Sequence, residues 1–370
     1  MIKYCKTCLL PNTKPNIKFE KSNICSACKF HSEKKNDLNK GINWKKRSVE
    51  FEQLLKKIKK KNAPLYDVCV PVSGGKDSIT QVHHLLNRGL RILAINIDYG
   101  IKTEVGVHNL NLISKMGAHL KIFTPNLKLQ KKIIKISFEK YGDPDLMSHC
   151  LLHSYPIRLA NILKIPLVLH GENSAYEYSG DKSYNEKFFN NKWFKKYAAN
   201  KSMTPLKFSK RHNIPYKDLI IYDCPSDKDL KKTNVIFTSY FFKWSGVINF
   251  KIAKKYGFKN LKKPGEGTYR NYVGIDEKIN RVHQYLKLLK FGYGRATDHA
   301  CEDIRNKKIT RKTGAKLVLK YDRVPLSSYY WDDFVKFLGI SKKSFFKTLN
   351  KYRNRKIWNK KNLKAMREFL

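Results

Sequence analysis

The sequence predicts an α/β protein in which a doubly wound parallel sheet lies between a small cysteine-rich unit and a mostly helical C-terminal region. Three observations support this fold class. Four cysteines near the start form two close pairs, strand-like runs alternate with helix-like stretches between residues 67 and 170, and residues 276–290 have the pattern of an amphipathic helix. A chain of 370 residues with 41% hydrophobic content can bury a full core, and we expect units at residues 1–35, 36–62, 63–260 and 261–370.

The first unit is predicted to be a zinc ribbon. Cys5 and Cys8 form one C-x-x-C pair, and sixteen residues separate them from the second pair, Cys25 and Cys28. Two thiolate pairs at this spacing suit one tetrahedral Zn²⁺, which would stabilise a unit too small to fold on its own core. Because four cysteines fill the coordination, a structural site is expected. A redox role for either pair is the weaker alternative, since the pairs form a matched set.

The next segment, residues 36–62, is predicted to be a charged helical linker. Phe51, Leu54, Leu55 and Ile58 recur at helical spacing and would face the following domain.

The domain at residues 63–260 has the pattern of a parallel sheet with crossover helices. We expect strands at 67–72, 91–97, 119–124 and 166–170, and helices at 79–88, 104–116, 127–141 and 151–164. Ligands of such sheets bind outside the carboxyl ends of the strands. Ser73, Asp98 and the run Gly171–Glu172–Asn173 fall at these ends, so they are expected to share one pocket.

The turn Ser73–Ser78 follows an apolar run and precedes a helix-like stretch. Adjacent glycines permit positive φ, and the amides of the next helix point toward an anion, so the turn is suited to phosphate. It is not a Walker A loop, because Asp77 interrupts the Lys-Ser pair. It resembles the pyrophosphate loop of the ATP-pyrophosphatase (PP-loop) superfamily, with its adenine nucleotide alpha hydrolase-like sheet; an ordinary glycine-rich turn is the alternative. The predicted cofactor-binding residues are Ser73, Gly74, Gly75, Lys76, Asp77, Ser78, Asp98 and Gly171.

Several of these residues also have predicted catalytic or metal roles. Lys76, Asp77 and Glu172 are expected to be catalytic, and Asp98 is expected to contact adenosine or, as a weaker alternative, Mg²⁺. Glu172 and Asp181 are further candidates for Mg²⁺ that bridges phosphates. Either carboxylate could instead cap a helix or bond loop amides.

The region 261–370 contains a second concentration of polar residues. In the run Gly292–Arg305, Asp298 and His299 are candidates for acid–base catalysis, and Arg295 or Arg305 could hold a substrate phosphate or carboxylate. Arg270 is a further candidate for substrate binding, and a structural salt-bridge cluster is the alternative. The tail, residues 331–358, has the outline of a helix-turn-helix, although paired short helices commonly serve packing alone.

Composition restricts the partners only weakly. The 76 Lys and Arg against 30 Asp and Glu give a net charge of +46, which attracts RNA, nucleotide sugars or membrane surfaces alike. A Lys-rich proteome would produce the same excess without nucleic-acid function. The aromatic and basic segment at 183–260 could stack bases or sugars, or could be core. With no long apolar stretch and no secretory signal pattern, a cytoplasmic location is expected.

Taken in order, the four cysteines, the Ser73–Ser78 loop, Gly171–Glu172–Asn173 and Gly292–Arg305 resemble the N-acetyl sugar amidotransferases of bacterial surface-glycan biosynthesis. The resemblance implies that ATP, with Mg²⁺, adenylates the oxygen of an acetamido group on a free or nucleotide-linked sugar. Ammonia then displaces AMP and leaves an acetamidino sugar for lipopolysaccharide O-antigen or flagellar glycan. The resemblance also implies two partners, a glutaminase subunit and a cyclase-like ammonia-channel subunit. The sequence carries no glutaminase nucleophile motif of its own.

Two other functions remain open. A tRNA-modifying sulfurtransferase would use the same adenylation on a nucleobase and would account for the charge, but it normally needs core cysteines, and this chain offers only Cys150 and Cys224 without a central C-x-x-C. A non-enzymatic nucleic-acid-binding protein would leave the Ser73–Ser78 loop without a role.

Overall fold

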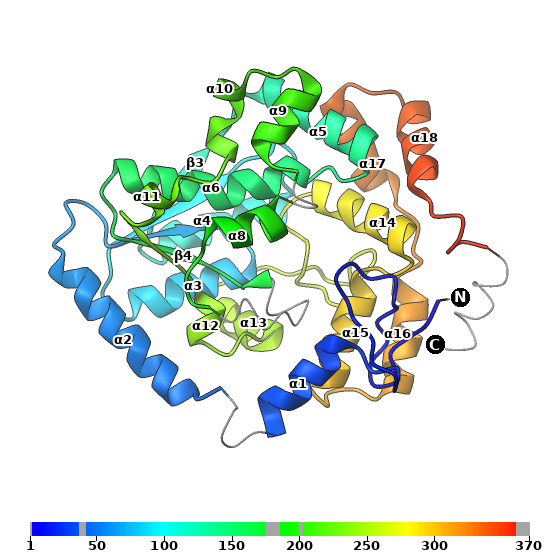
Figure 1. The fold of residues 1–370 in the computed structure, drawn as a ribbon, viewed down its shortest axis with the longest axis horizontal. Coiled ribbons are helices and arrows are strands. Elements are labelled where there is room, and N and C mark those ends of the chain that lie inside the picture. Colours follow the sequence, from blue (N-terminus) through cyan, green and yellow to red (C-terminus); the bar gives the residue numbers. More distant parts are fainter. Residues whose placement is uncertain (1, 37–41, 175–185, 200–202, 360–370) are drawn as a thin grey trace.

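The computed structural model describes residues 2–36, 42–174, 186–199 and 203–359, and its centre is a five-stranded parallel sheet (Figure 1). The strand order is β3-β2-β1-β4-β5, and every neighbouring pair is parallel. The strands are β1 Val68–Pro71, β2 Ile92–Ile97, β3 His119–Phe123, β4 Leu167–His170 and β5 Asn234–Phe237. The predicted doubly wound α/β class is therefore confirmed.

The central strands are apolar on both sides because helices cover both faces of the sheet. Val68 and Val70 of β1 pack into one core, whereas Cys69 between them packs into the other. The first core is covered by α2 Trp44–Lys60, α3 Lys76–Leu86, α4 Glu104–Lys115, α12 Thr238–Phe241 and α13 Gly246–Lys255. The second is covered by α5 Leu127–Tyr141, α6 Leu146–Ile162, α8 Asn191–Trp193, the π-helix Phe194–Ala198, α9 Pro205–His212, α10 Tyr216–Leu219, the 3-10 turn Ile220–Tyr222 and α11 Asp227–Leu230.

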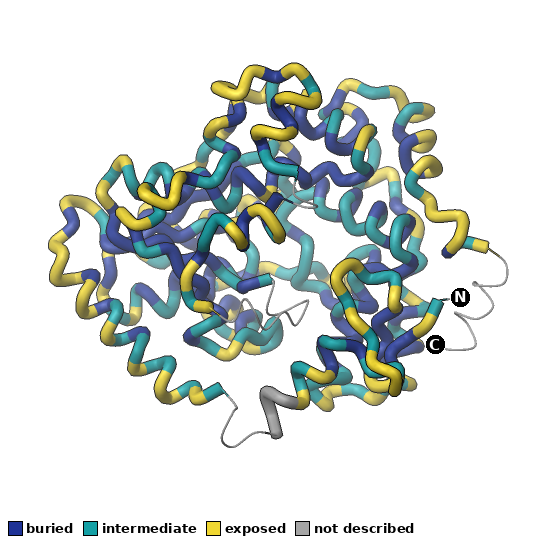
Figure 2. Tube along the Cα trace, viewed as in Figure 1, coloured by how far each residue is buried: buried dark blue, intermediate teal, exposed yellow. Residues whose placement is uncertain are grey.

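The described part of the segment at 36–62 packs against the sheet domain. Within it, α2 buries Phe51, Leu55 and Ile58 against the sheet core, as its helical spacing predicts. In Figure 2 the strands are largely buried, whereas α2 on the outside alternates between buried and exposed residues. Residues 37–41, at the start of this segment, lie outside the described residues.

The C-terminal region is helical, as expected. Its helices are α14 Ile279–Phe291, α15 Arg295–Arg305, α16 Arg311–Tyr321, α17 Ser328–Leu338 and α18 Lys342–Tyr352. The helix-turn-helix outline of the tail serves packing: the rings of Phe334 in α17 and Phe345 in α18 lie 5.2 and 5.4 Å from that of Phe138 in α5. No described helix is both long and apolar enough to cross a membrane.

The N-terminal unit packs on the C-terminal helices rather than on the sheet (Figure 1). It contains α1 Ser26–Asn36, and its buried Leu9 and Leu10 share one core with Cys301 of α15 and Val318 of α16. A side chain at Gly314 of α16 would lie 3.3 Å from Leu9 Cδ1, so the glycine permits this close contact. Two segments that lie far apart in the sequence therefore build one structural unit.

Two predicted helices begin earlier in the structure than expected, and one strand was not predicted. Helix α3 begins at Lys76, inside the glycine-rich turn, and α6 begins at Leu146 rather than near residue 151. Ser148 and His149 interrupt the apolar pattern at the start of α6, although Ser148 is buried in the helix. Strand β5 lies in the aromatic and basic segment and was not predicted. Trp193 and Phe194 of that segment are core residues rather than exposed stacking platforms.

Candidate functional site

The turn Ser73–Ser78 connects β1 to α3 at the carboxyl edge of the sheet and is closed by its own hydroxyls. Ser78 Oγ accepts from the Ser73 amide at 3.0 Å, and Ser73 Oγ accepts from the Gly75 amide at 3.1 Å. Gly74 has φ +86°, and a Cβ there would lie 2.8 Å from the backbone nitrogen of Leu110 in α4. Only glycine fits this position, so the turn holds the N-terminus of α3 close to the neighbouring helix. Such a helix N-terminus is suited to a phosphate group.

Lys76 and Asp77 are held together at the start of α3. Lys76 Nζ lies 2.6 Å from Asp77 Oδ2, and the other oxygen of Asp77 accepts from Asn249 Nδ2 at 2.7 Å. Asn249 belongs to α13, which packs closely along α3. The predicted loop residues are therefore brought together, and Asp77 is occupied by two protein donors here.

The C-terminal region reaches this loop through Arg270. The ideal Cβ position at Gly246 lies 3.3 Å from Arg270 Nη1 and 3.5 Å from Lys76 Cε, so both cationic side chains flank the same point. Arg270 Nη1 donates to Glu302 Oε2 and Nη2 donates to Asp303 Oδ1, each at 2.9 Å. Burial opposes the charge, but these two carboxylates outweigh it and raise the pKa of Arg270. The guanidinium is thus fixed and fully charged beside Lys76.

His299 and Asp298 differ in charge although they are adjacent in α15. His299 is buried, and its Nδ1 lies 2.8 Å from Thr268 Oγ1. Burial, followed by the nearby Arg270 and Arg295, holds the pKa of His299 well below its usual value, so the imidazole is neutral. Burial acts to raise the pKa of Asp298, but Lys287 and Lys14 hold it below the usual range. A neutral histidine suits proton transfer, whereas this carboxylate serves as a counter-ion.

Asp276 is a site residue that sequence reasoning missed. It was assigned to a helix that in fact begins at Ile279. Its carbonyl accepts from the Thr103 amide at 3.1 Å, at the start of α4, and this contact brings its carboxylate to Ser73. Burial raises the pKa of Asp276, while a hydrogen bond with Ser73 and the charges of Arg295 and Lys76 oppose the rise. The sequence did offer one signal for this residue, because Asp276 is an acidic residue directly after a loop that contains glycine.

The other predicted residues lie at the ends of β2 and β4. Asp98 accepts from the Gly100 amide at 2.9 Å through Oδ1, and its Oδ2 lies 3.1 Å from Lys102 Nζ. Gly171 follows β4, where a Cβ would lie 3.6 Å from the ring of Trp244, and Glu172 beside it is half-buried. Asp181 lies outside the described residues.

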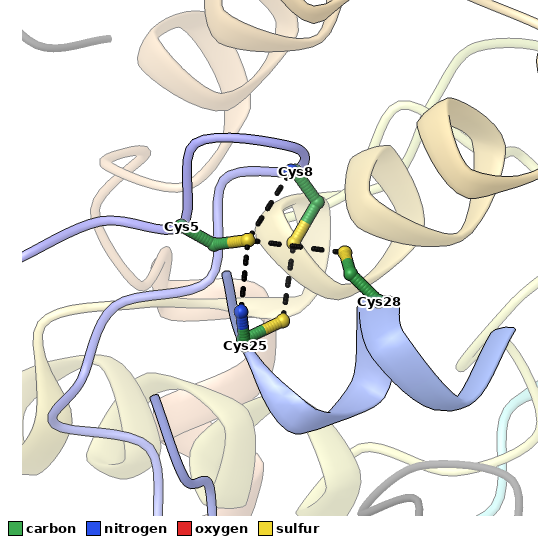
Figure 3. A group of neighbouring side chains, drawn as sticks. All are labelled: Cys5, Cys8, Cys25 and Cys28. Carbon is green, nitrogen blue, oxygen red and sulfur yellow. Dashed lines mark hydrogen bonds between the residues drawn. The ribbon is translucent and has the colours of Figure 1, made fainter. Parts of the chain in front are cut away.

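The four cysteines form a compact thiol cluster (Figure 3). All four Sγ atoms are buried within 4.8 Å of one another, with Cys5–Cys28 at 3.8 Å and Cys8–Cys25 at 3.7 Å. Four sulfurs placed about 2.3 Å from a central Zn²⁺ in a tetrahedron lie about 3.8 Å apart. The amides of Cys8 and Cys25 approach Cys5 Sγ at 3.5 and 3.3 Å, as donors do around thiolates. The donor set fits a structural zinc.

Arg305 contacts this cysteine cluster. The prediction that it binds substrate rested only on its position in the sequence. Its Nη1 lies 4.0 Å from Cys8 Sγ at the last turn of α15. Burial opposes its charge, but Cys301 and the cluster cysteines outweigh this and raise the pKa of Arg305. Arg295, at the first turn, is instead within electrostatic range of Asp276 and His299. The two arginines of α15 therefore face different sites.

Cys150 and Cys224 lie apart from the site residues just described. Cys150 is buried in α6, where its thiol contacts the carbonyls of Leu146 and Ala198, both at 3.7 Å. Burial raises the pKa of both thiols, so neither has the thiolate character that sulfur transfer requires.

Comparison with known proteins gives one family match and a set of similar solved structures, which includes two synthetases. The chain shares 15% identity with the NMN synthetase of Francisella tularensis (TM-score 0.28; 65% of this chain and 93% of that chain covered) and 14% with the NH3-dependent NAD synthetase of Campylobacter jejuni subsp. jejuni (TM-score 0.27; 61% and 100%). No curated protein matches. Residues 266–370, which include α14 to α18, match the family described as LPS biosynthesis protein WbpG-like, C-terminal domain.

Proposed function

We propose that this protein is an ATP-dependent amidotransferase that forms AMP and pyrophosphate and converts an N-acetylated sugar into an acetamidino sugar for a bacterial surface glycan. The observation that carries the proposal is that the side chains of Lys76, in the phosphate-type loop, and Arg270, in the C-terminal region, lie close to the same point. Arg270 and His299 both lie within residues 266–370, which match the lipopolysaccharide biosynthesis family, and this supports a site shared by the nucleotide loop and that region.

The loop would hold the β- and γ-phosphates of ATP. The amides at the start of α3 and the ammonium of Lys76 face the same edge of the sheet as Asp98, which would contact adenosine. Mg²⁺ bound with ATP would neutralise phosphate charge, and Asp98, Glu172 and Asp276 are the candidate carboxylates. Among the described residues the cysteines are the one preformed group of metal-ligating side chains, so phosphate oxygens would provide much of the Mg²⁺ coordination.

The chemistry has two steps. The acetamido oxygen attacks the α-phosphorus of ATP, an O–P bond forms, and the bond to pyrophosphate breaks. Ammonia then attacks the activated carbon, the C–O bond to AMP breaks, and one proton is released. Arg270 lies where it can stabilise developing phosphate charge, and neutral His299 can accept the proton and share it with Thr268. Catalysis would depend mainly on positioning and electrostatics.

Ammonia would come from a separate glutaminase through a cyclase-like channel subunit. The four cysteines would hold a structural zinc that fixes the N-terminal unit on α15 and α16. The competing function, tRNA sulfur transfer, has the +46 charge in its favour but would depend on Cys150 or Cys224, whose thiols have raised pKa values.

The test is turnover by the purified protein with ATP, Mg²⁺ and ammonium, using UDP- and CMP-linked acetamido sugars in one series and bulk tRNA in another. AMP and pyrophosphate are measured together with the mass of the sugar product. The proposal predicts AMP only when sugar and ammonia are both present. AMP formed only with tRNA would instead establish nucleobase modification, and ADP would exclude cleavage between the α- and β-phosphates.

A further inference from the structure

We infer that Lys14, Lys287 and Arg295 form an oxyanion subsite that binds a phosphate or carboxylate group of the sugar substrate. The subsite lies where the N-terminal unit meets α14 and α15. The inference rests on the proposed function for the identity of the ligand as a sugar, but its geometry does not depend on that function.

Two ammonium groups share a single carboxylate at this junction. Lys14 Nζ lies 3.5 Å from Asp298 Oδ1, and Lys287 Nζ contacts Asp298 Oδ2. The same two ammonium groups lie 5.1 and 4.9 Å from the ring centroid of Tyr293. The side chains of Lys14 and Lys287 are only 14% and 16% exposed. They are therefore held in place rather than extended into solvent.

One cation at this junction has no hydrogen-bonded acceptor among the described residues. Asp298 is shared by Lys14 and Lys287, Asp322 is a further carboxylate within electrostatic range of Lys287, and Arg295 also lies within that range. Across the part of the chain that the structure describes, no oxygen accepts a hydrogen bond from the Arg295 guanidinium. A partly buried guanidinium without a hydrogen-bond acceptor is costly, and an arriving oxyanion would supply that acceptor.

A small cavity with a mixed polar and apolar lining lies beside Arg295. Arg295 lines it together with Asn280, Gln284 and Thr268, and the carboxylate in its wall, Glu266, is paired with Arg281. Gln284 Oε1 is buried there without a hydrogen-bond donor among the described residues, and sugar hydroxyls would supply one. Lys287 follows Gln284 by three residues, so the two lie on neighbouring positions of one face of α14. Anion-binding and hydroxyl-binding groups are therefore adjacent.

The cavity also adjoins the reacting groups. Thr268 in its wall contacts His299 at 2.8 Å, and Ile275 in its wall precedes Asp276, which reaches Ser73. A sugar whose anionic group binds the subsite would extend from there toward the Ser73–Ser78 loop. The subsite would thus orient the acetamido group for adenylation.

The thiol cluster gives Lys14 its position. Lys14 lies in the loop between the two cysteine pairs, and Thr13 Oγ1 donates to the carbonyl of Phe291 at the end of α14 at 2.5 Å. The N-terminal unit would therefore take part in substrate binding.

A phosphate of a nucleotide-linked sugar and the carboxylate of an acidic sugar offer the same chemistry to this subsite. Titration calorimetry with UDP and with glucuronate distinguishes them, using protein saturated with α,β-methylene-ATP so that the ATP loop is occupied. Lys14→Met and Lys287→Met are compared with Lys18→Met, which alters an exposed lysine of the same loop. Lys14→Arg retains the charge if the methionine variants lose structure.

We expect the wild type to bind at least one probe, the two methionine variants to weaken its Kd at least tenfold, and Lys14→Arg and Lys18→Met to bind within threefold of wild type. UDP binding alone indicates a nucleotide-linked sugar, and glucuronate binding alone indicates an acidic sugar. Equal Kd values for wild type and Lys14→Met, or no binding of either probe, would overturn the inference. Because the experiment measures binding and not turnover, it can support the subsite even if the proposed reaction is wrong. It can also exclude the subsite without excluding the proposed reaction.

Discussion

Arg270, in the loop before α14, donates hydrogen bonds from both terminal nitrogens of its guanidinium to two consecutive carboxylates of α15. The distance from its Nη2 to Asp303 Oδ1 is 2.9 Å. Tyr269 donates to the other oxygen of Asp303 at 2.6 Å. These bonds fix the planar guanidinium next to Lys76, with little freedom left to lose when phosphate binds. Two carboxylates of α15 therefore fix a positive charge beside the Ser73–Ser78 loop.

Asp303→Ala should destabilise the protein by about 3 kcal/mol, because it removes one partner of a buried charge while Glu302 remains. The free energy of unfolding in urea measures this loss. Asp332→Ala, which breaks an exposed pair with Lys336 in α17, should leave that free energy essentially unchanged. Equal effects of the two substitutions would contradict a central role for the Arg270 pair.

Gly74→Ala should abolish ATP binding and destabilise the fold, whereas Gly117→Ala should cost only about 1 to 2 kcal/mol. Both glycines have positive φ, +86° and +108°, but an added Cβ meets the backbone of Leu110 at Gly74 and nothing within 4 Å at Gly117. Melting temperatures and ATP titrations of the two variants isolate the effect of the close contact. Retained ATP affinity in Gly74→Ala would show that the turn tolerates widening.

Lys76→Met should lower the rate of AMP formation at least a hundredfold, since it removes a cation positioned for phosphate charge. Lys128→Met, at an exposed position of α5, is the matched control and should retain full activity. Steady-state turnover with separate kcat and KM values for ATP is the measurement. A change confined to KM would indicate that Lys76 contributes only to ground-state binding.

Cys25→Ser should remove bound zinc and lower the melting temperature, while Cys224→Ser, outside the cluster, should retain one zinc per chain. Arg305→Met should weaken zinc retention against a chelator, because it removes the cation beside the Cys8 sulfur. Atomic absorption after dialysis and thermal unfolding give both readouts without an activity assay. Zinc content that does not differ between the two cysteine variants would refute the assignment.

The contact between His283 of α14 and Asp143 should make stability depend on pH. His283 Nδ1 lies 2.9 Å from Asp143 Oδ1 and 3.6 Å from Asp145 Oδ2. Burial disfavours the charged imidazole, but Asp143 and Asp145 outweigh it and raise the pKa of His283 above 6.5. Burial likewise disfavours the charged carboxylate, but His283 and Lys290 hold the pKa of Asp143 below 3.8.

A raised histidine pKa contributes stability that is fully present below about pH 6.5 and is lost as pH rises through the folded pKa. The lowered pKa of Asp143 contributes stability above about pH 3.8 that is lost as pH falls. The loss of unfolding free energy in His283→Gln should therefore be largest between about pH 4 and 6.5 and smaller above pH 8.

The sheet and the loop were predictable because their signals are local. The strand-like runs, the glycine pair and the cysteine spacing each depend on neighbouring residues, and the structure contains each of them. Strand β5 was not predictable in the same way. Its four residues lie in an aromatic segment, and they form a strand because β4 offers an unpaired edge.

The site residues show the same difference between those with a local sequence signal and those without one. Lys76 and Asp77 follow from the loop itself, but Asp276 reaches Ser73 only because a distant segment pairs beside α4, with Lys102 opposite Glu277. Arg295 and Arg305 look equivalent in the sequence, ten residues apart in one helix. They face different sites because the N-terminal unit packs against the last turns of α15.

The packing of Leu9 and Leu10 against α15 and α16 affects how the protein is made. These two leucines cannot complete their core until residue 318 has been synthesised, about 300 residues later. At typical translation rates this delay lasts roughly fifteen seconds to a minute. Early capture of zinc by the four cysteines would keep the nascent N-terminal segment compact during that interval, so metal supply would influence the yield of folded protein as well as its stability.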